Sequence, residues 1–144
     1  MEHNCIFCKI VKGEIPCSKV YEDDLVLAFM DIAPINKGHI LIIPKKHFLS
    51  LTSVPAEYLE AMMKIAPTIA QCAVREIDGD AFNLHLSNGQ CAGQVVPHVH
   101  LHVIPRKATD GFNFGWRALT YEESTEKDEL AEAIAKRIEK KLAE

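Results

Sequence analysis

Long apolar runs are absent from this 144-residue sequence. A transmembrane helix needs about 20 consecutive, mainly apolar residues, and no stretch approaches that length. The first residues also lack the layout of a secretory signal peptide, in which an apolar segment follows a short basic one. We therefore expect a protein with a cytoplasmic location and no membrane partner.

Blocks of basic residues are absent as well. Lys and Arg total 16 against 20 Asp and Glu, which gives a formal net charge of −4. Because nucleic-acid-binding domains usually carry a strongly basic surface, we expect no nucleic-acid partner. A small phosphorylated ligand is still compatible with this charge, since a few local groups can bind a phosphate.

Internal repeats, low-complexity tracts and linker-like stretches are also missing. The length suits one domain, residues 1–144, with a hydrophobic core that needs no disulfides. The cysteine count is five, an odd number, which argues against a disulfide framework. In a reducing compartment these residues are free thiols or metal ligands.

Hydrophobic periodicity predicts an α+β fold with a mainly antiparallel sheet. Apolar residues at helical spacing predict one long central helix over 56–77, with Pro67 inside it, and a C-terminal amphipathic helix over 125–142. Alternating or continuous apolar segments predict the strands. These are a hairpin within 20–30 and strands at 39–44, 82–86 and 98–103.

The most informative pattern lies at positions 98 to 103, where His alternates with Val or Leu. Successive side chains of a strand point to opposite faces, so His98, His100 and His102 would share one face. Imidazole can act as nucleophile, proton donor or metal ligand near neutral pH. Three imidazoles in line predict a chemical site, and a solvent-facing polar stripe is the weaker interpretation.

Two chemical interpretations of this pattern stay open on the residues alone. The histidines can perform covalent catalysis, or a His-x-His pair can hold a catalytic zinc that activates water. The second interpretation would make the chain a metallohydrolase. It lacks a nearby carboxylate, because no Asp or Glu lies between Asp80 and Asp110.

A second pattern is the Cys-x-x-Cys pair Cys5 and Cys8. Redox pairs of this type normally follow a strand and open a helix, and no strand precedes this one. Thiolates suit a tetrahedral zinc site, which needs two further ligands. One candidate is His47, and the other is His98 or His102. Several other histidines and cysteines are assigned no role in a site: His39, His85, Cys17, Cys72 and Cys91.

The segment from Gly93 to Arg106 resembles the signature of the histidine triad (HIT) family, His-φ-His-φ-His-φ-φ, where φ is an apolar residue. The similarity continues in the N-terminal half, in the segments 6–10, 15–16, 20–23, 28–32 and 38–47. Together these segments are most similar to bacterial HIT proteins of the Hint type. The resemblance implies the HIT-like fold, which binds nucleotides and forms a homodimer in which two protomer sheets join.

The family's chemistry is attack on the α-phosphorus of a nucleotide. The resemblance implies that His100 is the nucleophile and forms a nucleotidyl-histidine, which water then hydrolyses. It also implies that His102 contacts phosphate and assists the leaving group, that Gln94 binds phosphate oxygens, and that His98 completes the catalytic triad. The implied substrate contacts are Asp31 for the ribose hydroxyls, Ile6, Phe29 and Ile32 for the base, and Asn88 beside the phosphate.

The resemblance further implies a structural zinc site. Galactose-1-phosphate uridylyltransferases, a related branch, and some bacterial HIT proteins bind zinc through a Cys-x-x-Cys pair, a later His and the first triad His. The matching positions here are Cys5, Cys8, His47 and His98. A closed site of this kind would join the N-terminus to the catalytic strand and leave His100 free of metal.

We therefore predict a purine nucleoside phosphoramidase, or a nucleotidyl hydrolase or transferase, that acts on AMP or GMP derivatives such as phosphoramidates. Two residues depart from the pattern: Val95 stands where many Hint-type proteins carry Ser or Thr, and Pro97 replaces a common aromatic or polar residue. The first departure keeps a nucleotide-binding regulatory protein with little turnover as an alternative. The metallohydrolase is the other alternative.

Overall fold

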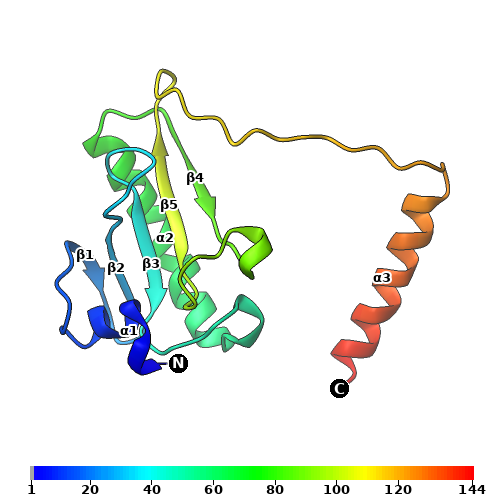
Figure 1. Ribbon diagram of the computed structural model, residues 1–144, viewed down its shortest axis with the longest axis horizontal. Coiled ribbons are helices and arrows are strands. Elements are labelled where there is room, and N and C mark those ends of the chain that lie inside the picture. The colour runs from blue at the N-terminus through cyan, green and yellow to red at the C-terminus, as the bar shows by residue number, and fades with distance from the viewer. Residues whose placement is uncertain (1) are drawn as a thin grey trace. The chain divides into compact units, whose positions relative to one another are not determined.

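The computed structural model describes residues 2–144, which form two compact units (Figure 1). The first unit ends at Phe112 and contains a five-stranded sheet, and the second, Asn113–Glu144, contains helix α3. Every residue classed as buried in the described chain belongs to the first unit. The first unit therefore holds the hydrophobic core.

The sheet is antiparallel throughout, with the strand order β1-β2-β3-β5-β4. Its strands are β1 (Lys19–Glu22), β2 (Val26–Met30), β3 (Ile40–Pro44), β4 (Ala81–His85) and β5 (Leu101–Arg106). β2 and β3 are almost wholly buried, as their near-continuous apolar sequences require of strands covered on both faces. The predicted α+β class and antiparallel sheet are confirmed.

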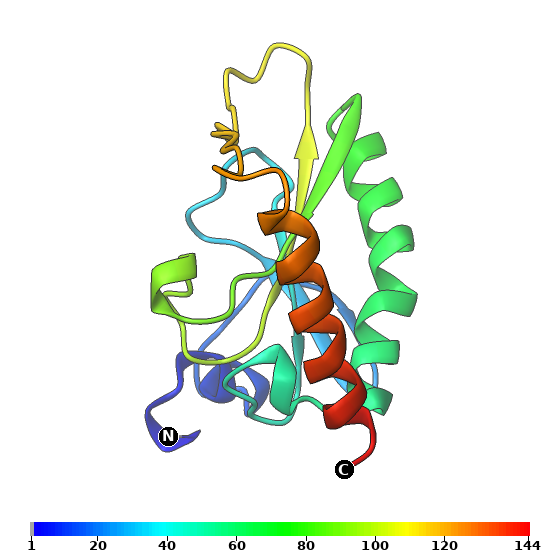
Figure 2. The same ribbon diagram turned by 90° about the vertical axis from the view of Figure 1, so that its right-hand side faces the viewer.

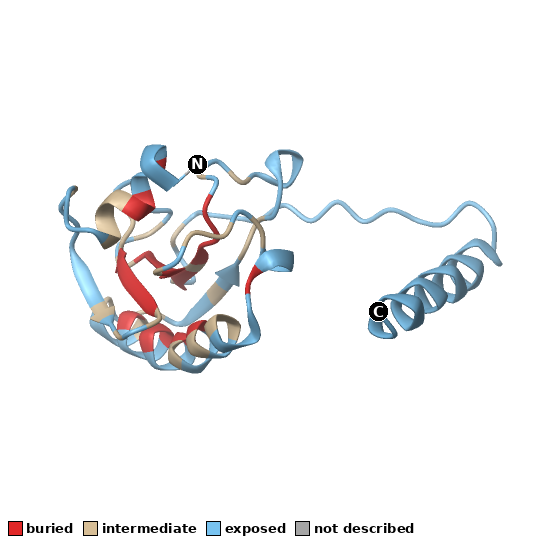
Figure 3. Cartoon of the chain, turned by 90° about the horizontal axis from the view of Figure 1, so that it is seen from below, coloured by how far each residue is buried: buried red, intermediate tan, exposed pale blue. Residues whose placement is uncertain are grey.

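One face of the sheet packs against α2 (Ala56–Glu76), the long helix predicted from periodicity. Its buried residues, including Met62, Ala66 and Ile69, join strand residues in one core cluster. Figure 3 shows the buried positions concentrated in the central strands and along this helix. The helix runs through Pro67 without ending, although proline supplies no N–H to the helical ladder.

The opposite face of the sheet carries the short helix α1 (Ile6–Val11). Figure 2 shows α1 and α2 on opposite sides of the sheet. In the β3–β5 register Leu41 pairs with His102, so these two side chains share the face that α1 covers. A second core cluster fills this face: Cys5, Phe7, Cys8, Leu27, Phe29, Leu41 and Ile43.

The strand predicted at 98–103 begins later than expected. β5 starts at Leu101, so His98 and His100 lie in the segment that precedes it. The pairing with β3 extends only to Leu101, opposite Ile42, and the N–H of Val99 instead donates to the carbonyl of Phe48 (2.8 Å). The predicted alternation still holds, because Val99 is buried in the α2-side core while the imidazoles lie on the other side.

In the second unit, α3 (Glu126–Leu142) confirms the predicted C-terminal helix. Acidic residues in its first turn and lysines in its last turn complement the helix dipole. Within this unit nothing covers its apolar stripe, with exposed fractions of 48% at Leu130 and 83% at Leu142. Across residues 2–144, no helix combines the length and apolarity that crossing a membrane would require.

Candidate active site and metal centre

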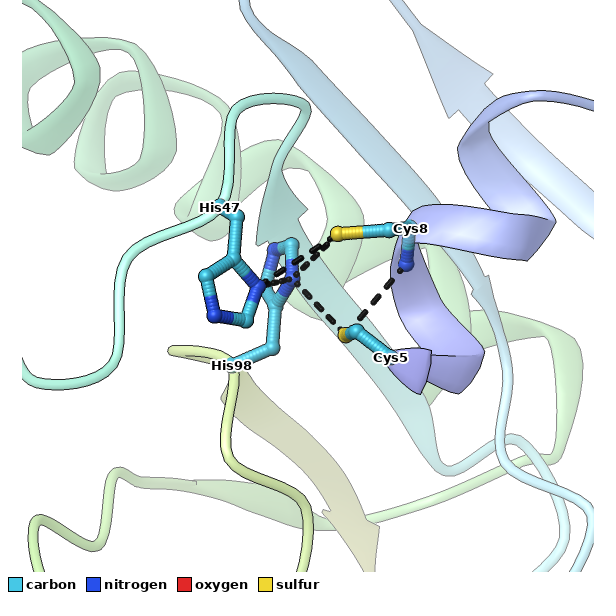
Figure 4. A group of neighbouring side chains, drawn as sticks. All are labelled: Cys5, Cys8, His47 and His98. Atoms are coloured by element: carbon cyan, nitrogen blue, oxygen red, sulfur yellow. Dashed lines mark hydrogen bonds between the residues drawn. The ribbon is translucent and has the colours of Figure 1, made fainter. Parts of the chain in front are cut away.

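Four predicted metal ligands from three separate segments converge next to the start of β5 (Figure 4). Cys5 caps the N-terminus of α1, where its Sγ accepts a hydrogen bond from the N–H of Cys8 (3.4 Å). His47 follows β3, and His98 precedes β5. The four ligand atoms all lie within 4.8 Å of one another.

The separations in this cluster fit a tetrahedral ion. The Nδ1 atoms of His47 and His98 lie 3.3 Å apart. Three of the four sulfur–nitrogen distances are 3.4 Å for Cys5–His98, 3.4 Å for Cys8–His47 and 3.6 Å for Cys8–His98. Around a tetrahedral Zn²⁺, usual bond lengths place two nitrogens about 3.3 Å apart and a sulfur and a nitrogen about 3.6 Å apart. The donor set therefore fits a closed, four-coordinate site.

The protonation of His98 is also consistent with a bound cation. Nε2 of His98 lies 2.8 Å from the carbonyl of Pro44, which can only accept, so the proton is on Nε2 and Nδ1 presents a lone pair to the cysteines. Burial lowers the pKa of His98 to about 4, which keeps the ring neutral. Burial, followed by the neighbouring Cys5, raises the pKa of Cys8 to about 11. A bound divalent ion would favour the thiolate instead.

The second triad residue, His100, is also held by a backbone carbonyl. Its Nδ1 donates to the carbonyl of His98 (2.7 Å), so Nε2 carries the lone pair. The ring is 8% exposed and packs edge-on against Phe7 at a centroid distance of 5.2 Å. Burial lowers the pKa of His100, and the ring is therefore a neutral imidazole with an unprotonated Nε2, the form required of a nucleophile.

The third triad residue, His102, contacts a histidine that the sequence did not single out. Its Nδ1 lies 2.8 Å from Nε2 of His39, and its ring centroid lies 4.9 Å from that of His100. His85 packs against the same ring at 5.8 Å. Burial lowers the pKa of His102 to about 4, so this ring is neutral as well.

His39 is the functional candidate that sequence reasoning missed. It is 2% exposed and immediately precedes β3, two residues before Leu41, which pairs with His102. The period of two along a strand places His39 and Leu41 on one face, so the strand pairing could have revealed it. Its Nε2 also lies 3.5 Å from Oδ2 of Asp31.

The residues predicted for the nucleoside lie in and around the α1-side core. Phe29 is buried and packs edge-on against Phe7, with ring centroids 5.6 Å apart. Ile6 and Ile32 are accessible, with exposed fractions of 44% and 98%. Asp31 follows β2, and its Oδ1 accepts a hydrogen bond from the N–H of Ala33 (2.8 Å).

The two predicted phosphate-side amides are bonded to loop backbone. Gln94 accepts from the N–H of Gly89 (2.8 Å) and donates to the carbonyls of Leu49 (2.8 Å) and Val96 (3.1 Å). Asn88 accepts from the N–H of Leu51 (2.7 Å). Both side chains thus stabilise the loop before β5 through hydrogen bonds. A phosphate contact through Gln94 Nε2 would replace one of these bonds.

An antiparallel α+β unit with three imidazoles at the start of one strand has the architecture of a histidine triad protein. The model of the HIT domain matches residues 12–109, which is more than half of the chain. The chain therefore belongs to the HIT family.

Relatives of known activity are among the similar sequences. Adenylylsulfatase HINT3 of Arabidopsis thaliana is 46% identical over 110 residues, which are 76% of this chain and 56% of that protein. The chain thus spans little more than half the length of the Arabidopsis protein. Adenosine 5′-monophosphoramidase HNT1 of Candida albicans is 38% identical over 147 residues, covering 97% of this chain and 92% of that protein.

Solved structures of the family have the same fold. A HIT family protein from Bacillus anthracis gives a TM-score of 0.86 at 43% identity, over 93% of this chain and 96% of that chain. A zinc-bound histidine triad family protein from Mycobacterium smegmatis gives 0.74 at 33% identity, over 97% and 99%. The predicted HIT-like fold is confirmed.

Proposed function

We propose that this protein is a nucleotide hydrolase of the phosphoramidase type, with His100 as its covalent nucleophile. The observation that carries the proposal is the hydrogen bond from His100 Nδ1 to the carbonyl of His98 (2.7 Å), which directs the lone pair to Nε2. The names of the two relatives, an adenylylsulfatase and an adenosine 5′-monophosphoramidase, support a purine nucleotide substrate. Such substrates are AMP or GMP joined to an amine or another leaving group.

The proposed reaction has two displacements. His100 Nε2 attacks the α-phosphorus, and the P–N bond to the amine breaks; the amine leaves with the bonding electrons and takes a proton from solvent. The resulting nucleotidyl-imidazolium keeps its Nδ1–H on the carbonyl of His98, which stabilises the positive charge. Water then attacks phosphorus and releases a proton to solvent, the bond to Nε2 breaks with its electrons returning to the ring, and neutral His100 is restored with release of the nucleotide.

We assign the substrate contacts as the family resemblance implies. Asp31 would bind the ribose hydroxyls, Ile6, Phe29 and Ile32 would contact the base, and Asn88 and Gln94 would lie beside the phosphate. His102 would donate a hydrogen bond to phosphate or the leaving group, and His98 would connect the reaction centre to the metal site. The exposure of Ile6 and Ile32 is compatible with contact to a bound base.

We also propose that Cys5, Cys8, His47 and His98 hold a structural Zn²⁺. The support is the tetrahedral spacing of their ligand atoms and the zinc-bound M. smegmatis relative. The ion would supply a cross-link between α1, the segment after β3 and the segment before β5. With all four positions taken by protein atoms, it would have no open site for substrate.

A metallohydrolase with its metal on the triad is less well supported by this geometry. Such a site needs neighbouring triad nitrogens directed at one ion, but His98 Nδ1 faces the cysteines. His100 Nδ1 is bonded to a carbonyl. A nucleotide-binding regulator would use the same substrate-contacting residues as the enzyme and differ only in turnover, a difference that hydrolysis of adenosine 5′-phosphoramidate measures.

We further propose a cytoplasmic homodimer formed through β4. This strand is at the edge of the sheet, where one row of backbone N–H and C=O groups lacks a neighbouring strand. Its side chains Phe82 and Leu84 are 42% and 38% exposed. A second β4, added antiparallel, would cover these groups and join two sheets into one.

Hydrolysis of adenosine 5′-phosphoramidate tests the proposed enzyme. Removing the nucleophile in His100→Ala is expected to lower kcat by roughly 1,000-fold or more, at a zinc content matched to wild type. His3→Ala, at an exposed position in the N-terminal turn, is the control and should leave turnover unchanged. Full activity of His100→Ala would contradict the proposal, and absence of turnover in the wild type would favour the regulator.

A further inference from the structure

The pair formed by His39 and His102 has a defined direction of hydrogen bonding. The backbone N–H of Ile35 lies 3.1 Å from Nδ1 of His39 and can only donate. Nδ1 of His39 must therefore be the unprotonated acceptor. A neutral imidazole carries one proton, which leaves the proton of His39 on Nε2.

The other side of the His39 ring supports the same tautomer. Oδ2 of Asp31 lies 3.5 Å from Nε2, and a carboxylate favours an N–H over a lone pair at that distance. His39 is 2% exposed, so solvent does not compete for either nitrogen. Two independent partners, a backbone amide and a carboxylate, thus specify one protonation pattern.

The tautomer of His39 determines the tautomer of His102, the third triad residue. The Nε2–H of His39 points to Nδ1 of His102 at 2.8 Å, so that nitrogen is the acceptor and the proton of His102 resides on Nε2. A proton on His102 Nδ1 would face the N–H of His39, donor against donor. The contact therefore disfavours both the other tautomer and the imidazolium form of His102.

We propose that His39 is a positioning residue that fixes the tautomer of His102, so that neutral His102 always presents an Nε2–H donor to the phosphate or leaving group at His100. The inference rests on the proposed function for what His102 contacts. The chain of bonds runs from the Ile35 N–H through His39 to His102, and it requires no proton transfer. Orienting partners of this kind typically contribute roughly 10- to 100-fold in activity.

The same three side chains, Asp31, His39 and His102, could also be read as a metal site, because their ligand atoms lie within 4.8 Å. An ion bound to Nε2 of His39 would move the ring proton to Nδ1. That proton would then oppose the N–H of Ile35, which lies 3.1 Å away. The backbone amide of Ile35 therefore favours the hydrogen-bonded arrangement of these side chains over metal binding.

Nitrogen NMR of ¹⁵N-histidine-labelled, zinc-loaded protein tests the inference directly, because the ring shifts report which nitrogen is protonated. Wild-type His102 is expected to be protonated on Nε2 alone at neutral pH. In His39→Leu, which cannot donate, the two tautomers should mix and kcat should fall roughly 10- to 100-fold with little change in KM. His39→Gln places an amide N–H near the former Nε2 and should restore both readouts.

A matched control is His85→Leu, which removes another ring that packs on His102 and should leave the His102 tautomer unchanged. A mixed tautomer in the wild type, or an unchanged one in His39→Leu, would overturn the inference whether or not the protein hydrolyses nucleotides. A fixed tautomer that is lost in His39→Leu and restored in His39→Gln would support it. Lack of hydrolysis alongside that pattern would contradict only the proposed function.

Discussion

Single nitrogen atoms distinguish the three triad residues, although all three are histidines. The Nε2–H of His98 donates to one backbone carbonyl and the Nδ1–H of His100 donates to a second, so the lone pairs of the two rings lie on opposite nitrogens. His102 is held by an imidazole donor instead. Two backbone carbonyls and the imidazole of His39 thus give each ring a different chemical role.

Acid should destabilise the fold through these neutral rings. Burial lowers the pKa of His102 from its ordinary 6.5 to about 4, so between these values the unfolded chain binds a proton that the folded chain excludes. The free energy of unfolding is therefore expected to fall as pH drops from 6.5 towards 4. Urea unfolding of wild type and His102→Gln measures this, and the variant should lose less stability over that window.

The control for this experiment is His3→Gln, at an exposed position, which should match the wild-type pH dependence. Equal slopes for wild type and His102→Gln would contradict burial of a neutral His102. The sequence could predict which residue types meet at this site, because alternation fixes the face. It could not predict the tautomers, since the carbonyl of Pro44 and the amide of Ile35 approach only in the folded chain.

Helix α1 is a short element whose stability is expected to depend on the Cys/His cluster. It has six residues, too few for a helix that is stable alone in water. Phe7 and Cys8 are its buried residues, and Cys5 and Cys8 contribute two ligand atoms to the Cys/His cluster. A bound ion would therefore stabilise α1 as well as the segments that carry His47 and His98.

Comparing the loss of one proposed metal ligand with the loss of an exposed thiol should show whether the bound ion stabilises the fold. Cys8→Ser is expected to lose most of its zinc and to lower Tm by roughly 5 °C or more, because metal binding contributes to folding. Cys17→Ser, at an exposed thiol, is the control and should retain both. Metal analysis and thermal unfolding of reduced protein measure the two effects, and full zinc content in Cys8→Ser would refute the assigned ligand set.

Element boundaries were less predictable than element types. Periodicity predicted α2 over 56–77, and the helix spans Ala56–Glu76 despite Pro67. The start of β5 was misplaced by three residues, from His98 to Leu101, because local alternation cannot reveal that the N–H of Val99 bonds to the carbonyl of Phe48 instead of extending the ladder with β3. The family resemblance supplied the ligand set, which the cysteine spacing alone left open.

At the scale of the whole molecule, the sheet has two edges with different expected roles. β4 and β1 are the edge strands, and only β4 is assigned to dimer contact. Sedimentation velocity should therefore give a dimer for the wild type and a monomer for Leu84→Asp. Val20→Asp, which places the same charge at a 46% exposed position of β1, is the matched control and should remain dimeric.

A monomeric wild type would contradict the proposed dimer, and dissociation of Val20→Asp alone would place the interface at β1. One domain over residues 1–144 stays a prediction for a chain with two compact units. Periodicity identified α3 as amphipathic, and within its own unit nothing covers the apolar stripe. Sequence patterns of this kind define a face of a helix but not the surface that covers it.

Trapping the covalent intermediate tests the proposed chemistry most directly. Zinc-loaded protein would be mixed with adenosine 5′-phosphoramidate, quenched within a turnover and digested for peptide mass spectrometry. We expect one AMP moiety on the peptide that contains His100, attached at Nε2, and no adduct in His100→Ala. Hydrolysis without any adduct, or an adduct on a different residue, would contradict His100 as the nucleophile.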